Sequence, residues 1–92
     1  MAADEHKWFD QDVLIIAGPR GLTTQSISNT RQAAEFLLYK WPDQRGRKHL
    51  AARKACMAVL EGLKEARIAR KAFAEAAAEA DILCAVQPKP FK

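Results

Sequence analysis

The hydrophobic residues of this chain change their spacing near residue 28. Before it, an apolar run over 12–17 (Asp-Val-Leu-Ile-Ile-Ala) and an apolar–polar alternation over 22–27 are typical of β-strands. After it, hydrophobic residues recur every three or four positions, which is the spacing of an amphipathic helix. The pattern therefore predicts strands first and helices afterwards, within one α+β fold.

The two strand-like segments predict a β-hairpin. The sequence between them, Gly-Pro-Arg-Gly at 18–21, suits a turn, because proline presets φ at the second turn position and glycine tolerates the exit. A glycine loop with an arginine is also conceivable as an anion site. It lacks, however, the lysine and serine that end a phosphate-binding loop, and a strand follows it. We therefore interpret 18–21 as a plain turn.

A helix is expected to begin after this hairpin. Ser28 or Asn29 can accept a hydrogen bond from the first helical turn, and Gln32 stands where a capping box needs it. Pro42 ends the helix at Trp41, because the residue before a proline is pushed out of helical geometry. The face expected to enter the core consists of Ala33, Ala34, Leu37, Leu38 and Trp41.

Two more helices are expected, over 47–61 and 64–80. Their apolar stripes are Ala52, Ala55, Cys56, Val59, Leu60 and Leu63 in the first, and Ala66, Ala69, Ala72, Phe73, Ala76, Ala77 and Ala80 in the second. The many alanines allow a neighbouring backbone to approach closely. Gly62 is well placed as a left-handed helix end, but it is the only break, so a single kinked helix is an alternative.

The apolar run Ile-Leu-Cys-Ala-Val over 82–86 predicts a third strand beside the first. The expected order is thus ββαααβ: a three-stranded sheet, made of the N-terminal hairpin and the C-terminal strand, with two to three helices on one face. A chain of 92 residues is expected to form a single domain. We expect an ordered core over 8–87, between a flexible N-terminus and a flexible tail that contains prolines.

Several of these residues together resemble a bacterial family. Trp41-Pro42 is followed by Gly46, Ala52, Cys56 and Gly62, then by Ala-Arg-x-Ala-Phe at 69–73, and then by Ala76, Ala77, Glu79 and Ala80. This combination, over 13–86, resembles the domain of unknown function 982, a family of small uncharacterised alphaproteobacterial proteins. The chain departs from the family at 62–65, where relatives often have a proline-containing helix start, and at Asp81, where many have glycine. The resemblance implies a fold and a bacterial context, and no catalytic residue.

No catalytic, metal or cofactor site is expected. His6 and His49 have no carboxylate partner that spacing would enforce, and Cys56 and Cys84 do not match the spacing of zinc ligands. We therefore predict a protein that is not an enzyme and needs no cofactor. Two separated cysteines, no visible secretory signal and apolar runs too short for a bilayer predict the cytoplasm and no membrane partner.

Basic side chains gather around the expected start of the second helix, in a chain of net charge +4. The candidates for an anion or nucleic-acid surface are Arg45, Arg47, Lys48, Arg53 and Lys54. Cations at a helix N-terminus are unfavourable unless an anion lies nearby. That anion is a nucleic-acid phosphate, an acidic partner or the chain's own acidic N-terminal stretch; a solvated face without a ligand is the further alternative. No interleaved aromatic residues or base-reading motif support nucleic acid.

A second candidate surface is apolar. Phe36, Tyr39, Leu50 and Met57 lie off the expected core faces of their helices. They either pack against a folded-over segment such as Trp8-Phe9 or remain exposed, as a partner surface or a homodimer interface.

Structural roles are expected of Trp41, Pro42, Gly62, Arg70 and Phe73. For Arg70 we expect an ion pair with Glu35 or with an acidic residue near the N-terminus. The sequence favours a protein-interaction or regulatory module whose partner is an unknown protein or a second copy of the chain. The alternative is a weak nucleic-acid-binding accessory protein that uses residues 45–54.

Overall fold

The structure, a computed structural model, describes residues 7–17, 23–42, 46–84 and 87. Two strands, β1 (Trp8–Ala17) and β2 (Thr23–Asn29), precede three helices, α1 (Thr30–Tyr39), α2 (Arg47–Leu60) and α3 (Ala66–Glu79). The predicted hairpin followed by helices is confirmed, and α2 and α3 are separate helices. The expected turn at 18–21 and the chain ends expected to be flexible lie outside the described residues.

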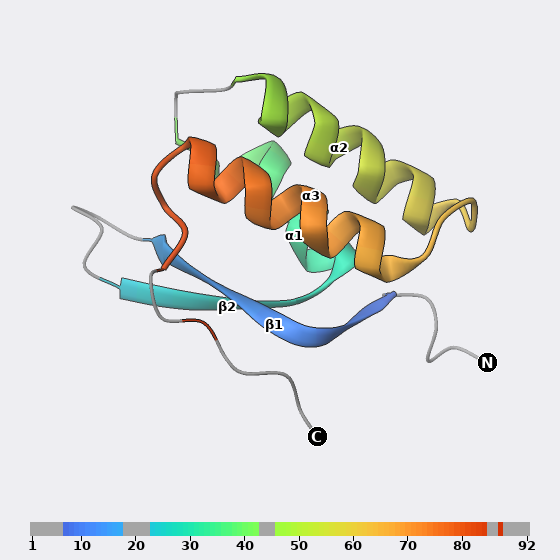
Figure 1. Cartoon of the computed structure of the whole chain (residues 1–92), viewed down its shortest axis with the longest axis horizontal. Coiled ribbons are helices and arrows are strands. Elements are labelled where there is room, and N and C mark those ends of the chain that lie inside the picture. The colour runs from blue at the N-terminus through green and yellow to red at the C-terminus, as the bar shows by residue number, and fades with distance from the viewer. Residues whose placement is uncertain (1–6, 18–22, 43–45, 85–86, 88–92) are drawn as a thin grey trace.

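The elements form three layers (Figure 1). The two-stranded sheet lies on one side, and α1 and α3 lie on one face of it, α1 against β2 and α3 against β1. Helix α2 forms the outermost layer and packs on α3 and α1 rather than on the strands. The helices thus cover one face of the sheet, as the sequence predicts, and the core lies between the layers.

The two strands pair antiparallel, with Val13 opposite Ile27. Because side chains alternate between the faces of a strand, Val13, Ile15 and Ile27 enter the same core and are buried. Strand β1 begins at Trp8, before the apolar run that predicted it. Its register with β2 is irregular between Trp8 and Val13. The irregularity allows Trp8, at the start of β1, to pair with Asn29 at the end of β2.

The predicted third strand over 82–86 is wrong for the described residues, where a single antiparallel bridge joins Ile15 to Leu83. The segment does lie beside β1, as expected. Ile16 N–H donates to the carbonyl of Ile82 at 2.7 Å, on one side of this bridge.

On the other side of the bridge, Cys84 N–H donates to the carbonyl of Leu14 at 3.0 Å. Gln87 takes up the remaining backbone groups of this pair. Its side-chain Oε1 accepts from Leu14 N–H at 2.9 Å, and its Nε2 donates to the carbonyl of Cys84 at 2.6 Å. A continuing antiparallel strand would join those two backbone groups directly. The amide of Gln87 lies between them and replaces this one backbone hydrogen bond of the pair.

Helix α1 begins as predicted. Asn29 Oδ1 accepts from Gln32 N–H at 2.7 Å, and Gln32 Oε1 accepts from Ser28 N–H at 2.7 Å. The helix ends at Tyr39, and its last backbone hydrogen bond runs from the cap residue to Phe36. Trp41 therefore follows the helix rather than belonging to it, because the proline after it disfavours helical geometry there.

Helices α2 and α3 end in the same left-handed motif. Gly62 has φ of +83° after α2, and Asp81 has φ of +63° after α3. In each case the residue that follows donates its N–H back to the last helical turn, at 2.8 Å after α2 and 2.9 Å after α3. The role expected of Gly62 is confirmed. Helix α3 starts at Ala66, slightly later than predicted.

Three aromatic rings pack edge to face in the core. The ring centroids of Phe36 and Trp41 are 5.8 Å apart, and that of Phe73 lies 6.3 Å from Phe36 and 5.8 Å from Trp41. Phe36 is only 5% exposed, so the prediction that it lies off the core face is wrong. Leu38, which was expected in the core, is 44% exposed. Phe36 rather than Leu38 occupies the buried position beside Phe73, because burying the larger phenyl ring removes more apolar area from water.

Candidate functional site

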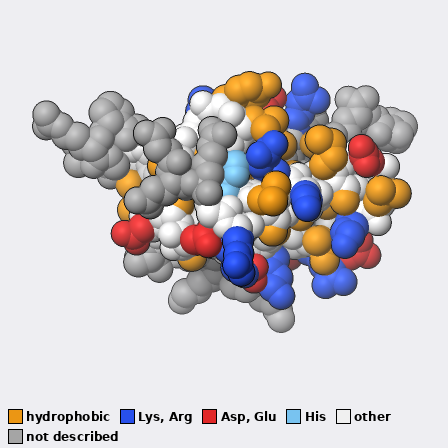
Figure 2. Space-filling model, turned by 90° about the horizontal axis from the view of Figure 1, so that it is seen from above, with side chains coloured by type: hydrophobic (Ala, Val, Ile, Leu, Met, Phe, Trp, Pro, Cys, Tyr) orange, Lys and Arg blue, Asp and Glu red, His pale blue; other side chains and the backbone are white. Residues whose placement is uncertain are grey.

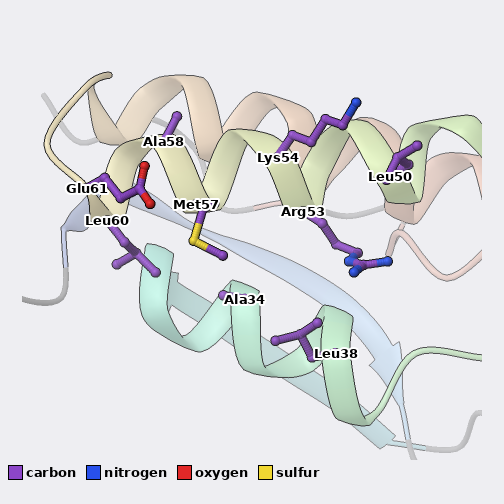
Figure 3. A pocket seen from close by; sticks show the side chains of 9 residues that line it. All are labelled: Ala34, Leu38, Leu50, Arg53, Lys54, Met57, Ala58, Leu60 and Glu61. Atoms are coloured by element: carbon purple, nitrogen blue, oxygen red, sulfur yellow. The ribbon is translucent and has the colours of Figure 1, made fainter.

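An open groove lies between α1 and α2 (Figure 3). Its volume is about 430 Å³, and we call it the α1–α2 groove. The side chains that line it are Ala34, Leu38, Leu50, Arg53, Lys54, Met57, Ala58, Leu60 and Glu61. The groove exists because α2 packs more extensively on α3 than on α1, which leaves part of its other side uncovered.

The groove gathers large hydrophobic side chains that are exposed. Leu38 of α1 is 44% exposed, and Leu50 and Met57 of α2 are 48% and 57% exposed. A single exposed leucine is ordinary on a protein surface. Several exposed hydrophobic side chains that line one concave surface indicate a binding site instead.

Basic side chains lie at the same groove. Arg53 and Met57 point from α2 towards α1, whereas Lys54 points away from it (Figure 3). The outer face of the molecule likewise shows hydrophobic side chains interspersed with Lys and Arg (Figure 2). Leu50 and Met57 of the predicted apolar surface therefore share one groove with Arg53 and Lys54 of the predicted basic surface.

The other members of the two predicted surfaces lie elsewhere. Tyr39 is 79% exposed, but it lines a separate hollow with Gln25 and Glu35. Phe36 belongs to the core. Arg47 is exposed in the first turn of α2, and Arg45 lies outside the described residues.

Carboxylates from α3 lie against the start of α2. Glu79 Oε1 accepts a hydrogen bond from Lys48 N–H at 3.1 Å, and Glu75 Oε1 lies 3.5 Å from Lys48 Nζ. A Cβ added at Gly46 would lie 2.5 Å from Glu79 Oε1, so glycine leaves room for this carboxylate. Among the described residues, α3 thus supplies carboxylates that offset the unfavourable cations at this helix start.

Arg70 joins α3 to β1. Its Nε donates to the carbonyl of Gln11 at 2.9 Å and lies 3.9 Å from Asp10 Oδ1. The expected pairing with an acidic residue near the N-terminus is confirmed. The alternative partner, Glu35, pairs with Arg31 within α1.

His49, which follows Arg47 and Lys48 in the chain, is buried. Its Nε2–H donates to the carbonyl of Leu37 at 2.9 Å, and its ring centroid lies 5.3 Å from that of Trp41. Carbonyls in the last turn of a helix lack a partner within the helix, so His49 satisfies one at the end of α1. The signal was present in the sequence, because His49 precedes Ala52 and Cys56 at the spacing of the buried stripe.

The described residues include one buried and one half-buried cysteine. Burial raises the pKa of the Cys56 thiol to about 12, so at neutral pH it is protonated and a poor nucleophile. Both cysteines are free. Within the described ranges, no group of three or more His, Cys, Asp and Glu side chains is placed to hold a metal ion. No helix in the same part of the chain is long and apolar enough to span a bilayer.

Comparison with known proteins places the chain in a family. Residues 14–84 match the family described as "Protein of unknown function (DUF982)". The chain is also similar to the NMR structure of the Agrobacterium tumefaciens protein Atu1219, with a TM-score of 0.75 and 28% sequence identity over 97% of this chain and 86% of that one. No curated protein matches it. Because the family match extends from β1 through all three helices, the chain belongs to the DUF982 family, whose function is unknown.

Proposed function

We propose that this protein is a non-catalytic protein-interaction module of the cytoplasm and that the α1–α2 groove is its binding surface. One observation carries the proposal: Leu38, Leu50 and Met57, all exposed, line the same groove. A regulatory role would follow from the identity of the bound protein, which is either a different chain or a second copy.

The chemistry of the groove suits a protein partner. Fully burying a Leu or Met side chain contributes about 1.5–3 kcal/mol, and these side chains, which are about half exposed, would each contribute about half of that. Met57 lies in its middle, and methionine adapts to partner surfaces because its side chain is unbranched and flexible. Arg53 and Glu61 add charge to the rim, which is where interfaces set orientation and specificity.

Site-specific photo-cross-linking in living cells tests the proposal. A photoreactive amino acid at position 57 is expected to form covalent adducts with a bound protein. The matched control is position 71 on α3, where Lys71 is exposed and does not line the groove. The substitution Leu50→Glu in the position-57 protein should abolish the adducts, because it places a charge in the apolar groove.

Each outcome decides the proposal. Adducts at position 57 that are absent at position 71 and are lost with Leu50→Glu support it. No adduct at position 57, or equal adducts at both positions, contradicts it. Circular dichroism of the purified Leu50→Glu variant must show the helical content of the wild type, so that loss of binding is not loss of folding.

Nucleic-acid binding is the second candidate. It is favoured by Arg47, Arg53 and Lys54, which have no ion-pair partner among the described residues. It is opposed by Glu75 and Glu79, whose negative charges lie where a phosphate would approach the start of α2.

An NMR titration with short single-stranded and duplex oligonucleotides tests this candidate. Binding that weakens steeply as salt rises, and that is lost with Arg47→Glu plus Lys48→Glu, would support it. Unchanged spectra, or binding insensitive to salt, would exclude it.

A further inference from the structure

We infer that the α1–α2 groove binds a second copy of the chain, and that the two copies meet through this same surface. They dock antiparallel, so that the two Met57 side chains meet on a two-fold axis. The inference rests on the proposed function and names its partner. It is carried by the order of charges along α2.

Arg53, Met57 and Glu61 form one ridge on the helix surface. They follow one another at intervals of four residues, and side chains with that spacing form continuous rows along a helix. All three are exposed and line the groove. Along the ridge the chemistry is therefore basic, apolar and acidic in turn, with Met57 at the centre.

A two-fold axis makes this ridge complementary to itself. When two such ridges lie side by side in opposite directions, Arg53 faces Glu61 of the second copy and Glu61 faces its Arg53. Met57 then faces Met57. Packing between rows of this spacing is the commonest arrangement of two helices in globular proteins, and the two-fold dimer is the commonest oligomer.

The flanking residues fit the same arrangement. Lys54 precedes Met57 by three positions and Leu60 follows it by three, so the axis brings the stem of Lys54 against Leu60 of the second copy. Lysine stems cover apolar surface while their charged ends remain in water. Leu60 is half-buried within its own chain, and a partner would cover the rest.

The charges of the ridge are free to pair with a partner. Among the described residues, neither Arg53 nor Glu61 has an ion-pair partner. A uniformly acidic partner, whether a peptide or a nucleic acid, would match Arg53 but oppose Glu61 with a like charge. The mixed ridge therefore favours a second copy over either of them.

Sedimentation equilibrium of the full chain tests the inference across about 1 μM to 1 mM, where weak to moderate complexes dissociate. We expect the wild type to form dimers in this range. Arg53→Glu and Glu61→Arg should each weaken dimerisation about tenfold, because symmetry places two like-charge contacts in every dimer. The double variant carrying both substitutions should restore it. Lys71→Glu, which changes the net charge by the same amount as Arg53→Glu but lies outside the groove, should leave it unchanged.

Met57→Lys gives a second measurement on the axis itself, where two lysines would face each other, and it should abolish the dimer. A wild type that stays monomeric throughout the range overturns the inference, as does a dimer that survives the single substitutions or a double variant that stays weakened. If the chain is monomeric while position 57 still cross-links a different protein, the second-copy inference fails and the proposed function stands. If neither occurs, both fail.

Discussion

The two faces of α2 differ in the size and in the charge of their side chains. The buried face consists of His49, Ala52, Cys56 and Val59, and it packs largely on α3. The alanines of α3 that meet the core, Ala69, Ala76 and Ala77, are equally small. The open face carries longer side chains, Leu50, Arg53 and Met57, beside the α1–α2 groove.

This difference explains why one helix pair closes and the other stays open. Small residues let two helix backbones approach, so α2 and α3 bury each other without a partner. Long side chains on the other face hold the neighbouring helix away and remain exposed. We expect substitutions on the closed side to affect the free energy of unfolding, and those on the open side to affect association.

The largest expected effect separates the core from the groove. Phe73→Ala should lower the free energy of unfolding by about 3–5 kcal/mol, because it leaves a cavity beside Phe36 and Trp41. Met57→Ala should change it by less than about 0.5 kcal/mol, because Met57 is exposed. Urea denaturation at a concentration where the protein is monomeric measures both. Similar losses for the two variants would remove the distinction.

The small size of the alanines that α3 buries in the core is tested by adding volume. Ala77→Leu should cost about 1–3 kcal/mol, since Ala77 is fully buried and a larger side chain forces the packed elements apart. The adjacent substitution, Ala78→Leu, is the control, because Ala78 is exposed on the same helix turn. Thermal unfolding of the pair gives the difference. Equal midpoints of thermal unfolding for the two variants would show that a small side chain is not required at position 77.

Burial of Cys56 should make stability depend on alkaline pH. Its pKa is raised from 9.0 to about 12 in the folded chain, so the buried thiol stabilises the fold fully below pH 9 and loses this effect as pH rises towards 12. The loss should reach roughly 1.4 kcal/mol at about pH 10. Denaturation of the wild type and Cys56→Ala at pH 8 and pH 10 isolates it. A difference between the two proteins that does not change with pH would contradict the burial of this thiol.

The carboxylate at the start of α2 should contribute about 1 kcal/mol, as helix caps do. Glu79→Gln removes the charge that faces the N–H of Lys48. Glu75→Gln is the matched control, and should cost less than about 0.5 kcal/mol because its ion pair with Lys48 is half exposed. Chemical denaturation of both variants compares them, and a larger loss for Glu75→Gln would reverse the assignment.

The smallest effect is a gain. Asp81→Gly should stabilise the chain by about 0.5–1 kcal/mol, because Asp81 has a positive φ that costs a residue with a Cβ more than glycine. Gly62→Ala, at the equivalent position after α2, should destabilise the chain by about 1 kcal/mol, because Gly62 also has a positive φ. Nothing lies within 4 Å of the added Cβ, so a steric clash does not contribute. Melting temperatures that move in the same direction for both variants would contradict this account.

Part of the candidate site can be recognised from the sequence. The spacing of α2 predicts that Leu50 and Met57 lie off the core stripe, and both are exposed. The same reasoning predicts this for Phe36, which is buried. The spacing of α1 places apolar side chains on more than one side of the helix. The spacing alone therefore does not determine which of these side chains contacts Phe73.

The amino-acid sequence by itself determined the type and order of the main elements and the way the helices end. These depend on local backbone preferences: the period of the apolar residues, the cap at Asn29, the proline after Trp41 and the glycine at 62. Only the tertiary structure decided that Gln87 would replace a backbone hydrogen bond beside β1, that His49 would be buried, and that the apolar and basic candidates would meet in one groove. Those outcomes depend on contacts between residues far apart in the chain, which local preferences do not encode.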